Sequence, residues 1–231
     1  MNQTILEALK NNYFFILYFA TFAIALVRYR RYFDSILKYF PIFIGYTILT
    51  ELLGFMILNF ETFQINYSEE YPYANNAIYN IYDLVFFFYF YTIFFKVIKK
   101  RKSKTLIKYG ALAYVIATVI NPFFEDWIIF PQTYALTIGS AVLIMTILLY
   151  FRDSKHRIEK NNNLLVWISI GLLVFNLFFP LIMLTALYST KFYQEFHLRQ
   201  IHHLLIVVMY GCFIIGFLQM NGKHTTIYED L

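Results

Sequence analysis

Two carboxylic acids, Glu51 and Asp83, interrupt stretches of the sequence that are otherwise almost wholly apolar. If each stretch is an α-helix, both side chains lie at a matching depth of roughly 11–14 Å from the outer end of their helix. An ionisable side chain in hydrocarbon is costly unless it faces a cavity or a partner. Both carboxylates are therefore candidate functional residues.

Amide and imidazole side chains extend this pattern. Asn80 lies three residues before Asp83, on the same face of a helix. Asn176 precedes Pro180 by four residues, and a proline leaves the carbonyl of residue i−4 without its helical donor. We predict one polar pocket, open to the outside, that binds a small ligand or ion, with Tyr79 and Tyr82 around it. Its predicted binding residues are Glu51, Asp83, Asn80, Asn176, His202 and His203.

These six residues could have one of three roles: a polar network that only locks the helices together, a ligand or ion site, or catalysis. A zinc-dependent intramembrane hydrolase is the least favoured, because His202 and His203 are adjacent and diverge by about 100° on a helix. A retinal protein is excluded, because the last apolar stretch has no lysine for a Schiff base. The sequence assigns no catalytic residue and no cofactor, leaves any metal open, and disfavours an enzyme.

The composition requires lipid around most of the chain. Of its 231 residues, 60% are hydrophobic, 22% aromatic and only 14% charged. Soluble domains carry about 25% charged residues, and this excess of apolar surface excludes a nucleic-acid-binding module. A bilayer requires roughly 20 apolar residues per helix. Seven stretches qualify, and they predict an all-α, polytopic membrane protein with a single domain over 1–231. Their expected bounds are 12–29, 38–60, 76–98, 105–122, 128–151, 163–187 and 201–219.

The basic residues predict the orientation of these helices. All but three of the 19 lysines and arginines fall on one side of the predicted bundle; the exceptions are Lys10, Lys191 and Arg199. Positive charge stays in the cytoplasm, so we expect the N-terminus outside and the C-terminus inside. The run Lys99-Lys100-Arg101-Lys102 is interpreted as a topology anchor that touches anionic lipid.

The order of the spans allows a 3+1+3 parallel repeat, in which the fourth helix reverses the chain and the last three helices repeat the first three. Gly45 and Leu58 in the second stretch fall opposite Gly171 and Leu184 in the sixth. Parallel repeats are a known transporter architecture.

Four stretches resemble a family. They are Thr50-Glu51-Leu52-Leu53-Gly54, Tyr79-Asn80-Ile81-Tyr82-Asp83, Trp167-Ile168-Ser169-Ile170-Gly171 and Cys212-Phe213-Ile214-Ile215-Gly216-Phe217. The chain is similar over nearly its full length to small seven-helix inner-membrane proteins of unassigned function from Bacteroidetes. That resemblance implies a multi-pass protein of the bacterial inner membrane and no particular chemistry.

The expected function is recognition of a small ligand or ion, as the membrane component of a sensing system. Its short loops leave no room for an output domain, so a cytoplasmic or membrane effector protein is a candidate partner beside the lipid bilayer. The alternative is a proton- or cation-coupled transporter of a small solute, in which Glu51 and Asp83 carry the coupling ion and Pro180 allows bending.

Overall fold

The computed structural model describes residues 14–65, 70–71, 74–153 and 164–220, and these residues are all-α. The helices, in chain order, are α2 (Phe14–Val27), α3 (Phe40–Asn59), α4 (Asn76–Val97), α5 (Arg101–Ile120), α6 (Thr133–Asp153), α8 (Leu164–Tyr188), α9 (Thr190–Glu195) and α10 (Leu198–Gln219). Three single turns of 3₁₀-helix join them: η1 (Tyr29–Arg31), η2 (Glu61–Phe63) and η3 (Asn121–Phe123).

Within the described residues, six helices are long and apolar enough to cross a membrane: α3, α4, α5 (extended through η3), α6, α8 and α10. Each of them turns apolar side chains outward; Ile42 of α3 and Tyr109 of α5, for example, are exposed. A bilayer is the solvent in which such a surface is stable. The chain is therefore a multi-pass membrane protein.

The first predicted span is represented by α2, an apolar helix of 14 residues that is shorter than a full crossing. Residues 12 and 13 of that span lie outside the described residues. The structure thus gives six full-length spans and one short apolar helix where the sequence predicts seven spans.

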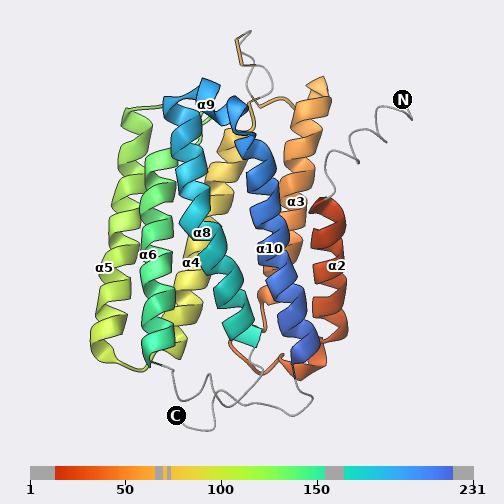
Figure 1. Cartoon of the computed structure of the whole chain (residues 1–231), viewed down its shortest axis with the longest axis vertical. Helices are drawn as coiled ribbons and strands as arrows, with labels where there is room; N and C mark the ends of the chain where they lie inside the picture. Colours follow the sequence, from red (N-terminus) through yellow and green to blue (C-terminus); the bar gives the residue numbers. More distant parts are fainter. Residues whose placement is uncertain (1–13, 66–69, 72–73, 154–163, 221–231) are drawn as a thin grey trace.

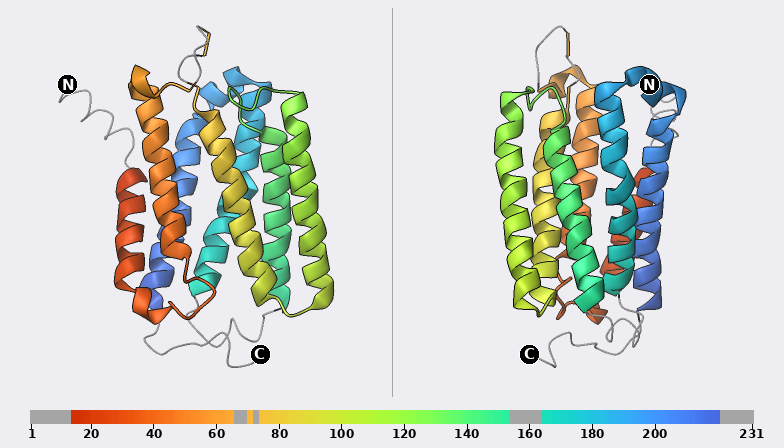
Figure 2. Two further views of the ribbon diagram at one scale, coloured as in Figure 1. Left: turned by 180° about the vertical axis from the view of Figure 1, so that it is seen from behind. Right: turned by 60° about the vertical axis from the view of Figure 1, so that its left-hand side comes forward.

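Successive long helices run in opposite directions, and six of them close a ring (Figures 1 and 2). Around the ring, α2 contacts α3, α3 contacts α4, α4 contacts α6, α6 contacts α8, α8 contacts α10, and α10 returns to α2. The remaining long helix, α5, packs outside the ring against α4 and α6 and is the least buried of the spans.

The two ends of the ring differ in charge. The basic end carries residues that include Arg28, Arg30, Arg31, Lys96, Lys100, Lys104 and Arg152, and the acidic end carries Glu61, Glu125, Asp126 and Glu195. At the basic end, the buried carboxylate of Asp153 accepts hydrogen bonds from Lys100 Nζ at 2.8 Å and from Ser103 Oγ at 2.8 Å. Lys100, within the predicted topology anchor, therefore also ties the start of α5 to the end of α6.

Glycines set the closest helix contacts. A Cβ atom added to Gly171 of α8 would lie 2.8 Å from the backbone oxygen of Met209 in α10. One added to Gly216 of α10 would lie 2.8 Å from Trp167 Cβ in α8. Small residues at helix interfaces in lipid allow such close approach of backbones. These two positions explain why α8 and α10 form the most extensive helix pair.

Some helix boundaries differ from those expected. The predicted span 105–122 begins earlier, at Arg101, because the helix extends into the basic run. The predicted span 128–151 begins later, at Thr133, because the preceding segment is bent over α4 and its carbonyls are hydrogen-bonded by side chains of that helix. The short helix α9 was not expected; Ser189 caps it by accepting a hydrogen bond from Phe192 N at 3.3 Å.

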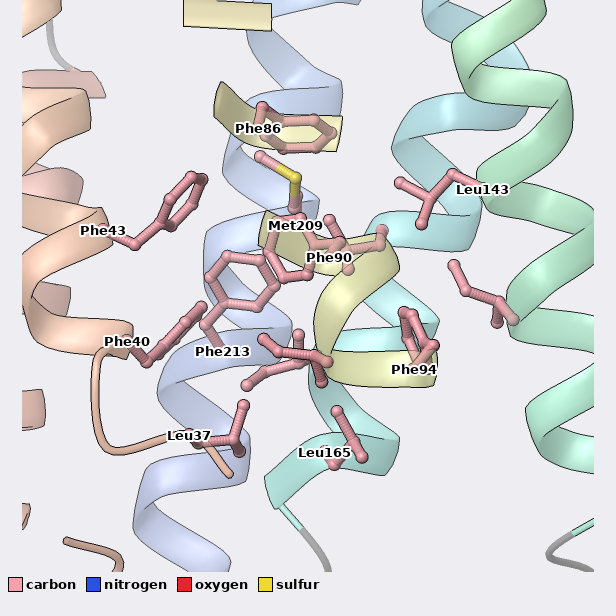
Figure 3. Close-up of a cluster of buried hydrophobic side chains, with 14 of the residues drawn as sticks. Leu37, Phe40, Phe43, Phe86, Phe90, Phe94, Leu143, Leu165, Met209 and Phe213 are labelled. Atoms are coloured by element: carbon pink, nitrogen blue, oxygen red, sulfur yellow. The ribbon is translucent and has the colours of Figure 1, made fainter. Parts of the chain in front are cut away.

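A buried layer of phenylalanines fills the ring in its basic half (Figure 3). Its rings touch from helix to helix: Phe43 of α3 and Phe90 of α4 have centroids 5.2 Å apart, Phe43 and Phe86 of α4 6.0 Å, and Phe40 of α3 and Phe213 of α10 5.4 Å. We call this set, Phe40, Phe43, Phe86, Phe90 and Phe213, the aromatic floor. It joins α3, α4 and α10 across the centre of the ring.

Candidate functional site

A cavity of about 350 Å³ lies inside the ring, above the aromatic floor. Six helices line it, and its lining includes Leu58 and Asn75 at the acidic end and Phe86 at the aromatic floor. All six side chains predicted to bind a ligand line this one cavity: Glu51, Asp83, Asn80, Asn176, His202 and His203. The structure thus brings together residues from α3, α4, α8 and α10 that are up to 152 positions apart (203 − 51).

Glu51 projects from α3 and is held by two phenols. Tyr79 Oη donates to Glu51 Oε2 at 3.1 Å, and Tyr18 Oη lies 3.5 Å from Glu51 Oε1. Tyr79 comes from α4 and Tyr18 from α2, so this carboxylate links three helices. Hydrogen bonds from hydroxyl groups stabilise the ionised form of a carboxylate.

Asp83 has no hydrogen bond or ion pair to any described residue. It lies one turn after Tyr79 on α4, and Phe86 and Phe87 follow it in the lining of the cavity. Its carboxylate is therefore free to interact with whatever occupies the lower part of the cavity.

The two carboxylates do not lie at matching depth, contrary to expectation. Glu51 pairs with Tyr79, and Thr47, one turn before Glu51, pairs with Tyr82 at 3.1 Å. Asp83 is therefore about one turn, roughly 5 Å, closer to the aromatic floor than Glu51. The expectation assumed that both helices end at one level. In the structure α3 extends past the start of α4: Asn75, just before α4, donates from Nδ2 to Gly54 O at 3.4 Å, and α3 continues from Gly54 to Asn59.

Asn80 binds the connection between α5 and α6. Its Nδ2 donates to the carbonyls of Trp127 at 2.7 Å and Phe130 at 3.0 Å, and its Oδ1 accepts from Gln132 N at 2.9 Å. These three bonds hold the 127–132 segment over the end of α4. Because both ends of the amide are bonded to backbone, Asn80 forms part of the wall.

Asn176 is bonded in a similar way. Its Oδ1 accepts from Ser140 Oγ at 3.0 Å, which ties α8 to α6, and its Nδ2 donates to Leu172 O at 2.9 Å in its own helix. The side chain is 1% exposed. This geometry is typical of an interhelical lock, with Pro180 one turn further along α8.

The two histidines face different neighbours. His202 stacks on Phe179 of α8 with centroids 4.6 Å apart, whereas His203 lies against Phe14 of α2 at 5.3 Å. Their own centroids are 6.1 Å apart. The described residues contain no group of three or more His, Cys, Asp or Glu side chains placed to hold one metal ion.

Several lining residues were missed from the sequence. Tyr18 contacts Glu51, and Phe175 and Phe179 stack at 4.8 Å to form an aromatic wall beside His202. Nothing in the sequence distinguishes Tyr18 from the other aromatic residues, because the chain contains 21 tyrosines and 27 phenylalanines. Arg199, which also lines the cavity, has a usable signal, since it is one of only three basic residues on the acidic side of the sequence pattern.

No protein-family model matches the chain, and neither a curated protein nor a solved structure matches it significantly.

Proposed function

We propose that this chain is a multi-pass protein of a bacterial inner membrane that recognises a small ligand from outside, as the membrane component of a sensing system. The observation that carries the proposal is the shape of the cavity together with its polar residues. The cavity lies at the acidic end of the ring, contains two carboxylates, and is separated from the basic end by the aromatic floor.

The orientation of the cavity follows from the charge at the two ends. Basic loops favour the cytoplasm, and the basic end holds the turns between α2 and α3 and between α4 and α5. The cavity is at the opposite end, so this orientation faces it outward. Because six helices line the cavity, a ligand bound there can change the relative positions of the helices that it contacts, and with them the positions of their cytoplasmic ends.

A cavity closed on one side favours recognition over passage. For a solute to cross, the buried rings of Phe40, Phe90 and Phe213 have to separate, and each is at most 1% exposed. Packed interiors resist such opening because rings that move apart forfeit the dispersion attraction between them. Transport is the second candidate, supported by Pro180 in α8, which lies one turn from the lock at Asn176.

Blocking the cavity tests the proposal. Met183 of α8 lines the cavity, and Leu187, one turn later, is exposed outside it. We expect Met183→Trp to abolish the thermal stabilisation that a panel of inorganic ions, amines, carboxylates and sugars gives the purified protein. The matched control Leu187→Trp retains it. If no member of the panel stabilises the wild type, or if both variants respond equally, the cavity is not a recognition site.

Sensing and transport are separated by reconstitution. Vesicles that contain the protein show no uptake of a stabilising ligand if the function is sensing, and cross-linking in cells captures a cytoplasmic or membrane effector. Uptake that depends on a proton or sodium gradient, and that Glu51→Gln abolishes, establishes the transporter instead.

A further inference from the structure

We infer that the ligand of this cavity is a small organic cation: a protonated amine with an apolar body about the size of one aromatic ring. This inference rests on the proposed function, because it assigns the chemical class of ligand to the same cavity. It is carried by three observations on the lining: the carboxylate of Asp83, which has no partner among the described residues, the remaining acceptor capacity of Glu51, and the aromatic side chains of the other walls.

The first observation is that the deep carboxylate has no partner. Asp83 makes no hydrogen bond or ion pair to a described residue, although it lies beside the aromatic floor. A carboxylate in low dielectric is stabilised by a cation or by several hydrogen-bond donors. An ammonium group supplies both, since it has a positive charge and N–H donors in one compact group.

The second observation is the arrangement of donors around Glu51. Tyr18 and Tyr79 hold its two oxygens from either side. A carboxylate has about four lone-pair sites, so Glu51 still accepts further hydrogen bonds. Glu51 and Asp83 lie at two depths of the same cavity, on the neighbouring helices α3 and α4. The two negative charges therefore both attract an ammonium group that enters the cavity.

The third observation is the nature of the remaining walls. Phe175 and Phe179 of α8 are stacked, and Tyr82 of α4 and Tyr210 of α10 line the same space. Aromatic faces attract organic cations and also bury apolar groups. A cavity of about 350 Å³ is at the small end of the range for ligand pockets, about 300–1,000 Å³, which limits the apolar body to a single ring or a short chain.

Arg199, the arginine in the lining of the cavity, is compatible with a cationic ligand. Arg199 lies in the first turn of α10 and is exposed, whereas the carboxylates lie deeper in the ring. Solvent screens an exposed guanidinium more strongly than it screens a charge inside the cavity. An anionic ligand, in contrast, brings its charge toward Asp83 and Glu51 without a described cation at that depth to offset them.

Three probes of one shape and different charge test the assignment: 2-phenylethylamine, 2-phenylethanol and 3-phenylpropanoate. Binding to the purified full-length protein is measured by calorimetry at pH 7 and constant ionic strength. We expect the amine to bind at least tenfold more tightly than the alcohol, and the carboxylate not to bind. Asp83→Asn and Glu51→Gln each weaken the binding of the amine at least tenfold and leave the affinity for the alcohol unchanged. The control is Glu61→Gln, which replaces an exposed carboxylate outside the cavity and changes neither affinity.

The outcomes separate this inference from the proposed function. If the alcohol or the carboxylate binds as tightly as the amine and Met183→Trp abolishes that binding, the cavity is a recognition site but not for cations. The inference is also overturned if the amine still binds with unchanged affinity to both Asp83→Asn and Glu51→Gln. It is overturned as well if sodium chloride alone stabilises the wild type against heat as much as the amine does. If neither these probes nor the ion and metabolite panel bind the wild type, the proposed function itself is wrong.

Discussion

At the scale of single residues, the polar side chains of the cavity divide into two groups. Asn80 and Asn176 have both ends of their amides bonded to other parts of the protein. Glu51 keeps unused acceptor capacity, and Asp83 is not bonded to any described residue. Removal of a member of the first group costs stability, whereas the second group is available for binding.

Asn80→Ala is expected to destabilise the protein by about 1–3 kcal/mol, because it removes the side-chain partner of three backbone groups of the 127–132 segment, in hydrogen bonds that are partly buried. The matched control is Asn59→Ala, since Asn59 is exposed and, among the described residues, its side chain donates only to Phe55 O in its own helix. Thermal unfolding is followed by a thiol-reactive dye on Cys212, the one cysteine of the chain. Equal melting temperatures for the two variants contradict this clamp role.

Asp83→Asn is expected to raise the melting temperature of the ligand-free protein. An unpaired carboxylate beside the aromatic floor is costly to hold ionised, and a neutral amide of the same shape avoids roughly 1–3 kcal/mol of that cost. Glu61→Gln serves as the control for loss of one exposed negative charge. A lower melting temperature for Asp83→Asn alone indicates that the carboxylate is part of a structural lock.

At the scale of helices, the contact between α8 and α10 determines how closely the cavity walls approach below the histidines. Gly171 and Gly216 bring the two backbones together, each against the other helix. Phe179 of α8 then lies within stacking distance of His202 of α10. A change at these glycines therefore alters both the stability of the bundle and the shape of the cavity.

Gly171→Ala is expected to lower stability, because the added Cβ meets Met209 O at 2.8 Å and the Cβ of Cys212 at 3.1 Å. Gly211→Ala in α10 is the control. Nothing lies within 4 Å of its added Cβ, so its higher helix propensity stabilises by up to about 1 kcal/mol. The two variants are compared by circular dichroism during heating in detergent. Similar shifts in both would mean that α8 and α10 adjust without cost.

At the scale of the whole molecule, the ring has two different halves. The acidic half contains the cavity, and the basic half contains the aromatic floor and the Lys100–Asp153 ion pair that fixes the start of α5. Under the proposed function, this division gives the molecule one face for a small ligand and one for a protein partner. The 3+1+3 repeat stays a prediction, with α5 as its reversing helix outside the ring.

Reporter fusions test the orientation. An enzyme that is active only in the cytoplasm should be active when fused after Lys104, at the basic end, and inactive when fused after Glu70, which follows α3. The expectation rests on the asymmetry of basic residues between the two ends. Activity after Glu70 reverses the orientation, and with it the proposal that the cavity faces outward.

The sequence alone determined the class of the protein and the identity of its unusual residues. Stretches of about 20 apolar residues are helices in lipid whatever their neighbours, because the backbone must satisfy its own hydrogen bonds there. The rarity of Glu51 and Asp83 in such stretches made them stand out, and the cavity contains both. The alternating direction of successive helices follows from this pattern, whereas the sequence only predicts that the six polar residues share one cavity, and the structure brings them together there.

Only the tertiary structure decided which of these side chains are hydrogen-bonded to other parts of the protein and which keep polar atoms available for a ligand. The partners of Asn80 lie 47 to 52 positions away, and that of Asn176 lies 36 away. Periodicity within one helix carries no information about such contacts, because it fixes the face of a side chain and not the neighbour opposite it. The offset between α3 and α4 likewise depends on how Gly54 meets Asn75 and Tyr79. That packing places Asp83 a turn below Glu51.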